Sequence, residues 1–228
     1  IEFLAGISER LSEMEMDVTL SATRGDDVPV YRRLARTRAV DAVIVSGPLV
    51  EDPRIALLAE IGMPVVVHGR TRVPRPYAYL DIDNQGAFKR ATDLLLDFGH
   101  TSIALINGDR RLTFALHREQ GWRQALTQRG VVARPDFAVG GAMSEENGYR
   151  YARALLERPD PPTAFVISSV ISALGVQRAL RDLGLVAGRD VSLVAHDDGL
   201  PAIRPDVMMP ALTTTYSSIR MAGERLGA

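Results

Sequence analysis

Apolar runs of strand length alternate with amphipathic stretches of helical length along most of the chain. The strand-type runs are rich in Val, Ile and Ala, whereas the helical stretches repeat apolar residues every three or four positions. The predicted strands are DVTLSA (17–22), DAVIVSG (41–47), MPVVVHG (63–69), AYLDID (78–83), SIALING (102–108), FAVGG (137–141), TAFVIS (163–168), DVSLVAHDD (190–198) and LTTTYSS (212–218). The predicted helices are 2–15, a segment through Tyr31 and Leu34, 55–61, 85–98, a segment through Arg118, Trp122 and Leu126, 145–156, 173–183 and a C-terminal helix.

This alternation is typical of parallel sheets that are covered by helices on both faces. The pattern runs twice, with a break near Gly99 and His100. We therefore expect an α/β fold of two doubly wound, Rossmann-like subdomains. The chain opens directly in a helix, so a first strand is expected to be missing before it. In such sheets ligands bind outside the carboxyl ends of the strands.

The composition is that of an ordinary soluble globular protein. The 228 residues are 46% hydrophobic and 24% charged, and no apolar run approaches the roughly 20 residues of a membrane helix. The chain has no Cys, which excludes disulfides and thiolate chemistry and fits a cytoplasmic protein. A net charge of −1 gives no overall electrostatic attraction to nucleic acid.

The sequence lacks the motifs of the common enzyme and metal sites. The four His residues are scattered, and the only acidic cluster beside one is His196, Asp197 and Asp198. Adjacent strand residues point to opposite faces, so these three side chains are not expected to converge on a metal. The motifs GxSxG, GxGxxG and GxxxxGK[ST] are absent, and no nucleophile–base pair is evident. We therefore expect no metal, no cofactor and no enzymatic activity.

Three polar residues follow the ends of predicted strands in the second half of the chain: Arg118, Ser169 and Asp197. Each alone also fits an ordinary role, such as a surface helix residue or the cap of a solvated turn. Together they suit a polyhydroxylated ligand, because a carboxylate accepts from two neighbouring hydroxyls and a guanidinium donates to hydroxyl or ring oxygens. For Asp197, a metal site and a catalytic acid are the alternatives to this role of hydroxyl binding.

A succession of short motifs resembles a known family. In order, they are DIDNQGAFKRATDLLLDFGH, then HREQGWRQAL after SIALING, then PPTAFVIS with ALGVQRALRDLGL, then GRDVSLVAHDD, then ALTTTYSS. The ordered set resembles the effector-binding core of bacterial transcription regulators of the lactose-repressor (LacI/GalR) family. The resemblance covers almost the whole chain, from FLAGI to the end.

The resemblance implies the fold of type I periplasmic sugar-binding proteins, in which two subdomains close around a small molecule. The N-terminal subdomain would cover residues 1–100, completed by about 213–228, and the C-terminal subdomain would cover 101–212. The chain would cross between them near residues 100, 198–201 and 212–219. The effector would be a mono- or disaccharide.

The resemblance also assigns roles to single residues. The ligand-binding Arg and Asp of the family match Arg118 and Asp197, so Asp197 would bind ligand hydroxyls, and a polar ligand residue matches Ser169. Pocket-lining positions match Phe3, Met143, Tyr216 and Ile219, with Arg70 and Phe114 as further candidates. The chain departs from the family in having Val170 in place of a common Asp, Met143 at a position that is often aromatic, and His196 before the two acids.

The expected function is therefore the effector-binding and dimerisation core of a cytoplasmic transcriptional regulator. Such regulators bind operator DNA as homodimers through an N-terminal helix-turn-helix, which these 228 residues do not contain, and cleft closure on the ligand changes operator affinity. One alternative is a periplasmic sugar-binding protein of a transporter, against which the GH and LTT segments argue. A second alternative is a sugar-modifying α/β hydrolase.

Overall fold

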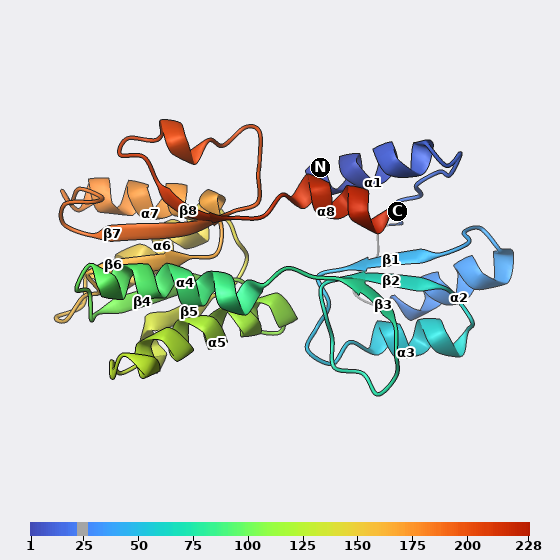
Figure 1. Cartoon of the computed structure of the whole chain (residues 1–228), viewed down its shortest axis with the longest axis horizontal. Helices are drawn as coiled ribbons and strands as arrows, with labels where there is room; N and C mark the ends of the chain where they lie inside the picture. Colours follow the sequence, from blue (N-terminus) through green and yellow to red (C-terminus); the bar gives the residue numbers. More distant parts are fainter. Residues whose placement is uncertain (22–26) are drawn as a thin grey trace. The chain divides into compact units, whose positions relative to one another are not determined.

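The computed structural model describes residues 1–21 and 27–228, which form two compact units (Figure 1). Unit 1 comprises Ile1–Ile82 and Ile219–Ala228, and unit 2 comprises Asp83–Ser218. Within the described ranges the chain therefore passes between the units after Ile82 and again after Ser218. Both units are layered α/β structures with parallel sheets, as the sequence predicts.

Unit 2 is built on a five-stranded parallel sheet of order β5-β4-β6-β7-β8. Its strands are β4 (Ile103–Asn107), β5 (Ala138–Gly140), β6 (Ala164–Ile167), β7 (Ser192–Asp197) and β8 (Thr213–Tyr216). Its helices are α4 (Asn84–Asp97), α5 (Thr113–Gln128), α6 (Glu145–Leu156) and α7 (Val170–Asp182), with short 3₁₀ turns η1 (Pro135–Phe137) and η2 (Pro205–Val207). The pair α4 and α5 covers one face of the sheet and the pair α6 and α7 covers the other (Figure 1).

The central strands of unit 2 are apolar on both faces because both faces are covered. Every residue of β4 and of β6 is buried. Phe88 and Trp122 fill the layer under α4 and α5, and Phe165 lies fully buried within β6. This burial of continuous apolar strands explains why period-two alternation is absent from their sequences.

Unit 1 has a three-stranded parallel sheet of order β1-β2-β3. The strands are β1 (Val43–Ser46), β2 (Val65–His68) and β3 (Ala78–Leu80). The helices are α1 (Glu2–Ser12), α2 (Val28–Thr37), α3 (Pro53–Glu60) and α8 (Ile219–Leu226). Helices α1 and α8 pack against each other on one side of this sheet, and α2 and α3 lie on its other side (Figure 1).

Neighbouring helices meet through glycines, where their backbones touch. A Cβ atom at Gly175 of α7 would lie 1.9 Å from the carbonyl oxygen of Glu145 in α6, and one at Gly148 of α6 would lie 2.1 Å from the carbonyl oxygen of Ser172. The same is true at Gly121 in α5, where a Cβ would lie 2.1 Å from a backbone oxygen of α4. Only glycine permits helix axes to approach this closely.

One of the predicted strands, at residues 17–22, is not observed over its described residues. Asp17–Ser21 form no strand, and Ala22, the last residue of that predicted strand, lies outside the described residues. The apolar side chains of this segment, Val18 and Leu20, are 40% and 77% exposed, so the alternating pattern finds no sheet to pair with in the described residues. The expected strand before residue 1 lies outside this sequence and stays a prediction.

The boundary between the units also differs from the predicted one at residue 100. Helix α4 packs on α5 and on β6, β7 and β8, so it belongs to unit 2 and the division falls after Ile82. Gly99 and His100 form the turn from α4 into β4: Gly99 has φ +87°, and the His100 N–H donates to the Leu95 carbonyl. The segment 198–201 lies within unit 2, and β8 pairs with β7, so the second passage falls after Ser218.

Candidate ligand-binding site

The carboxyl edge of the unit 2 sheet gathers most of the polar residues that the sequence singles out. Parallel strands end on the same edge, so Asn107 of β4, Ser168 and Ser169 after β6, Asp197 of β7 and Tyr216 of β8 all lie along it. Arg118 reaches this edge from the second turn of α5. The edge of an open α/β sheet is where ligands are expected.

Arg118 is a buried guanidinium held by polar and aromatic contacts. It is 4% exposed, its Nε donates to Asn84 Oδ1 at 2.8 Å, and its Nη1 donates to the Ser168 carbonyl at 2.7 Å. Its Cζ lies 4.9 Å from the ring centroids of both Phe88 and Phe114. The guanidinium is thereby fixed in orientation before any ligand arrives, which is the arrangement a planar donor needs to bind with specificity.

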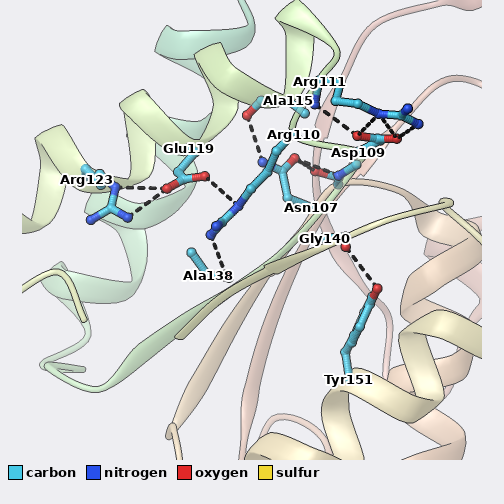
Figure 2. A network of polar contacts seen from close by, with 12 residues as sticks. Asn107, Asp109, Arg110, Arg111, Ala115, Glu119, Arg123, Ala138, Gly140 and Tyr151 are labelled. Carbon is cyan, nitrogen blue, oxygen red and sulfur yellow. Dashed lines mark hydrogen bonds and ion pairs between the residues drawn. The ribbon is translucent and has the colours of Figure 1, made fainter. Parts of the chain in front are cut away.

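Asn107 organises the backbone between the end of β4 and the start of α5 (Figure 2). Its Nδ2 donates to the Ala115 carbonyl at 2.8 Å, and its Oδ1 accepts from the Gly108 N–H at 2.8 Å and from the Ser168 hydroxyl at 2.7 Å. Because Ser168 also accepts from Arg118, the amide of Asn107 links the ends of β4 and β6 to α5. The sequence reasoning passed over this residue, since an NG dipeptide after a strand reads as an ordinary turn.

The loop after Asn107 carries charged groups that are paired with each other (Figure 2). Asp109 accepts from the Arg111 backbone at 2.9 Å and from its guanidinium at 2.6 Å, and these contacts lower the pKa of Asp109 to about 2. Arg110 donates to the Ala138 carbonyl at 2.7 Å and contacts Glu119 at 3.4 Å. These pairs hold the loop that lies above the start of α5.

Asp197 and Asp198 have different surroundings. Asp197 Oδ1 accepts from the Gly199 N–H at 2.8 Å, and its side chain lies at the end of β7. Burial raises the pKa of the Asp198 carboxyl. The positive charge of Arg118 offsets part of this rise, and the negative charge of Asp197 adds to it. Two adjacent acids at the end of β7 and the buried guanidinium of Arg118 give this edge charge-assisted acceptors and a donor for hydroxyl groups.

His196, which precedes the two acids, is buried and neutral. It is 1% exposed, and burial, followed by the positive charge of Arg118, lowers its pKa to about 3. Its Nδ1 hydrogen-bonds with Thr215 Oγ1 and its Nε2 with Ser217 Oγ, both at 2.9 Å. Its Nε2 is also 3.5 Å from Asp198 Oδ1, but a neutral imidazole forms no ion pair there.

The remaining unit 2 candidates differ in how accessible they are. Ser169 is 2% exposed, and its hydroxyl caps α7 by accepting from the Ile171 N–H at 3.1 Å, so part of its polar capacity serves the fold. Phe114 is partly buried against Arg118. Met143, just before α6, and Tyr216, at the end of β8, are 37% and 66% exposed. Both are therefore accessible to a ligand at this edge.

Unit 1 has its own set of groups at the carboxyl edge of its sheet. The predicted residue Phe3 stacks on the His68 ring, with centroids 4.6 Å apart and planes inclined by 22°. His68 ends β2 and its Nδ1 is 3.2 Å from the hydroxyl of Ser46, which ends β1. Burial lowers the pKa of His68, and the Asp81 carboxylate opposes this shift.

Ser46 and His68 were not among the predicted site residues, although each is the last polar residue of a predicted strand. Of the other unit 1 candidates, Arg70 is directed to Asp81 at 2.7 Å and lies 5.9 Å from the Tyr79 ring centroid. Ile219 begins α8 and is partly buried. These placements leave their assigned roles in ligand binding as predictions.

The chemistry available at the two edges is hydrogen bonding. Within residues 1–21 and 27–228, no three His, Asp or Glu side chains come together as metal ligands would. In the same ranges, no helix has the length and apolar character to cross a membrane. The Ser46–His68 contact has the form of a nucleophile–base pair, and measurement of turnover is the way to test it.

Comparison with known proteins identifies the family. The sequence model described as "Periplasmic binding proteins and sugar binding domain of LacI family" matches residues 1–224. The chain belongs to this family. The LacI-family assignment agrees with the order of the motifs along the chain and with the parallel sheets of both units.

Several relatives of this LacI-family chain are named as regulators. It is 44% identical to the HTH-type transcriptional regulator AglR of Rhizobium meliloti over 99% of its own length and 64% of AglR. It is 33% identical to the HTH-type transcriptional regulator RafR of Escherichia coli over 88% of its length and 60% of RafR. The chain thus spans somewhat less than two thirds of these relatives.

The fold is shared with a solved complex of another LacI-family protein. The structure of the transcriptional regulator CelR–cellobiose complex superposes with a TM-score of 0.85 and 28% identity, over 99% of this chain and 69% of that one. A regulator from Bacillus cereus gives a TM-score of 0.91 at 25% identity, over 99% of this chain and 80% of the other. The relatives are named as regulators, which is the function that the sequence resemblance predicts.

Proposed function

We propose that this chain is the effector-binding core of a LacI-family transcriptional regulator and that its effector is a sugar. The observation that carries the proposal is the fixed guanidinium of Arg118 on the same sheet edge as the Asp197 carboxylate. A donor and an acceptor that are both charged and both held in place suit a ligand with many hydroxyl groups.

A disaccharide is the preferred class of effector. The CelR structure contains cellobiose, and the present chain shares its fold over nearly its whole length. The partly buried ring of Phe114 beside Arg118 supplies apolar surface for a sugar ring, and on the same sheet the exposed Met143 follows β5 and the exposed Tyr216 ends β8.

Operator DNA is the proposed second ligand, bound by a dimer of the whole regulator. The chain spans 64% of AglR, and AglR is named as an HTH-type regulator, which supports operator binding by the whole protein. Effector and operator binding would then be coupled. The effector would change the affinity for the operator, and the operator would change the affinity for the effector by the same factor. The protein is proposed to act in the cytoplasm, where the operator is.

A thermal-shift panel tests the effector proposal directly. Cellobiose, maltose, trehalose, raffinose, glucose and galactose would each be added to this chain. A ligand at 100 times its Kd adds about 2.7 kcal/mol of stability, which is about 5–10 °C in Tm for a chain of this size. A selective shift with one sugar supports the proposal, whereas no shift with any sugar, in this chain and in the full-length protein, refutes it.

Asp197→Ala, with Asp206→Ala as the matched control, tests the site. Asp206 is an exposed carboxylate paired with Arg204, so its loss leaves the sheet edge intact. Loss of two charge-assisted hydrogen bonds is expected to weaken sugar binding at least about 100-fold in Asp197→Ala, while the free protein loses only about 1 kcal/mol of stability because the Gly199 N–H loses its acceptor. Equal sugar affinity in both variants would remove Asp197 from the site. Absence of sugar hydrolysis by the wild-type protein separates a regulator from the hydrolase alternative.

A further inference from the structure

His196 connects the candidate ligand residue Asp197 to the segment by which the chain leaves unit 2. It lies on β7, directly before Asp197, and pairs in register with Thr215 of β8. Its two ring nitrogens hydrogen-bond with the hydroxyls of Thr215 and Ser217. Ser217 stands two residues before Ile219, where the chain enters unit 1.

The backbone repeats this connection. The Ser217 N–H donates to the Asp197 carbonyl at 3.0 Å, so Ser217 contacts both the residue that carries the acid and the residue before it. The hydroxyls of Thr215 and Ser217 are two positions apart, which places them on the same side of an extended segment. One imidazole therefore fixes the last two residues on that side before the passage.

The imidazole is suited to this task because it stays neutral. A neutral ring has one donor and one acceptor, and hydroxyl groups act as either, so both nitrogens are satisfied without a charge. The groups that face it are Arg118, whose charge disfavours protonation, Asp198 at 3.5 Å, and the Phe88 ring with its centroid at 6.2 Å. Phe88 also packs on the Arg118 guanidinium, so Arg118 and His196 border the same ring.

We propose that His196 is a positioning residue, which transmits the ordering of Asp197 by a bound sugar to residues 215–218. The proposal rests on the proposed function, because it requires a sugar on Asp197. A ligand that fixes the end of β7 restricts His196, and His196 then restricts the Thr215 and Ser217 hydroxyls. The segment that leaves unit 2 is thereby more ordered when the site is occupied.

Hydrogen exchange measured by mass spectrometry tests this in the whole chain. The probe is whichever of cellobiose, maltose, trehalose and raffinose stabilises the wild-type protein, added at saturation. In the wild type, the sugar is expected to slow exchange in peptides covering 213–219 by about five-fold or more, including the Ser217 amide. The variants Thr215→Val and Ser217→Ala each remove one hydroxyl partner of His196 but leave Asp197 and Arg118 in place.

Thr214→Val is the matched control, because it makes the same change on the same strand at a position whose side chain faces the other way. The two test variants are expected to keep the sugar Kd within about three-fold and to lose at least half of the sugar-dependent protection of 213–219. The control is expected to behave as the wild type. A single change leaves one nitrogen of the imidazole unpaired, which can weaken the fold. The triple variant His196→Leu, Thr215→Val and Ser217→Ala replaces all three polar groups by apolar ones, and it is used in the same exchange experiment if a single variant is unstable.

Three results overturn the proposal. Full protection of 213–219 in the test variants would show that the hydroxyls transmit nothing. A loss of sugar affinity as large as in Asp197→Ala would show that the His196 contacts serve binding itself. If sugar binds the wild type without protecting 213–219, this inference fails alone, whereas if no sugar binds at all, the proposed function fails with it.

Discussion

Acidification should destabilise this protein well above the pH at which its carboxylates titrate, because of His196. The ring is 1% exposed, and burial together with the Arg118 charge lowers its pKa from 6.5 to about 3. Between pH 6.5 and pH 3, the imidazole of His196 therefore binds a proton in the unfolded chain but not in the folded chain. Stability rises with pH wherever the unfolded state binds more protons, so this contribution is complete above pH 6.5 and is lost as the pH falls toward 3.

The size of the effect follows from the two pKa values. For a single group with pKa 6.5 unfolded and about 3 folded, the free energy of unfolding falls by about 2 kcal/mol between pH 7 and pH 5. That is about 4–8 °C in Tm for a chain of this length. Burial also lowers the pKa of His68 and of His100, and these rings add to the loss in the same direction.

Urea unfolding of the wild type and of His196→Gln at pH 7 and pH 5 isolates the contribution of His196. Gln keeps a donor and an acceptor but does not titrate, and the other His residues contribute equally to both proteins. The wild type is expected to lose about 2 kcal/mol more than the variant over this interval. Parallel losses in the two proteins, within about 0.5 kcal/mol, would refute a neutral, desolvated His196.

Four further substitutions have defined outcomes. Gly175→Ala places a Cβ 1.9 Å from the Glu145 carbonyl oxygen, so the free energy of urea unfolding should fall by about 1–3 kcal/mol. Arg118→Lys loses the planar fork and its stacking, and calorimetry should show at least about ten-fold weaker sugar binding. Asn107→Ala leaves buried groups unpaired and should lower the free energy of unfolding by about 1–3 kcal/mol. Arg70→Ala removes the Asp81 ion pair and the Tyr79 ring contact of a side chain that is 49% exposed, so the free energy of unfolding should fall by less than about 1 kcal/mol; a larger loss would show that Arg70 is needed to pair the more buried Asp81.

The order of strands and helices could be read from the sequence because it depends on local periodicity. Helix α6 occupies the predicted residues 145–156, where Ser144 caps the start and Pro159 follows the end. The strand predicted at residues 17–22 is not observed over its described residues because strand formation depends on more than local periodicity. A strand exists only if it pairs with a neighbour, and a run of alternating residues does not record whether one is available.

The boundary between the units shows the same limit. The turn at Gly99 was visible, but the face on which the helix before it packs is decided by contacts with β6, β7 and β8, which come later in the chain. Asp197 could be singled out as a candidate because a charged residue at a strand end is conspicuous. The partners of Arg118 were not found, since Asn84 and Ser168 are 34 and 50 residues away in sequence and meet it only through packing.

The glycine contacts between helices have a mechanical consequence. Where the backbones of α6 and α7 touch at Gly148 and Gly175, neither helix has room to roll about its own axis, and the same holds for α5 against α4 at Gly121. Each face of the unit 2 sheet is therefore covered by a pair of helices in direct backbone contact. We therefore expect a strain at the sheet edge to be taken up mainly by the two connecting segments at 82–83 and 218–219. Unit 2 is thus expected to respond as a rigid body that moves at its two connections to unit 1, rather than to change its own shape.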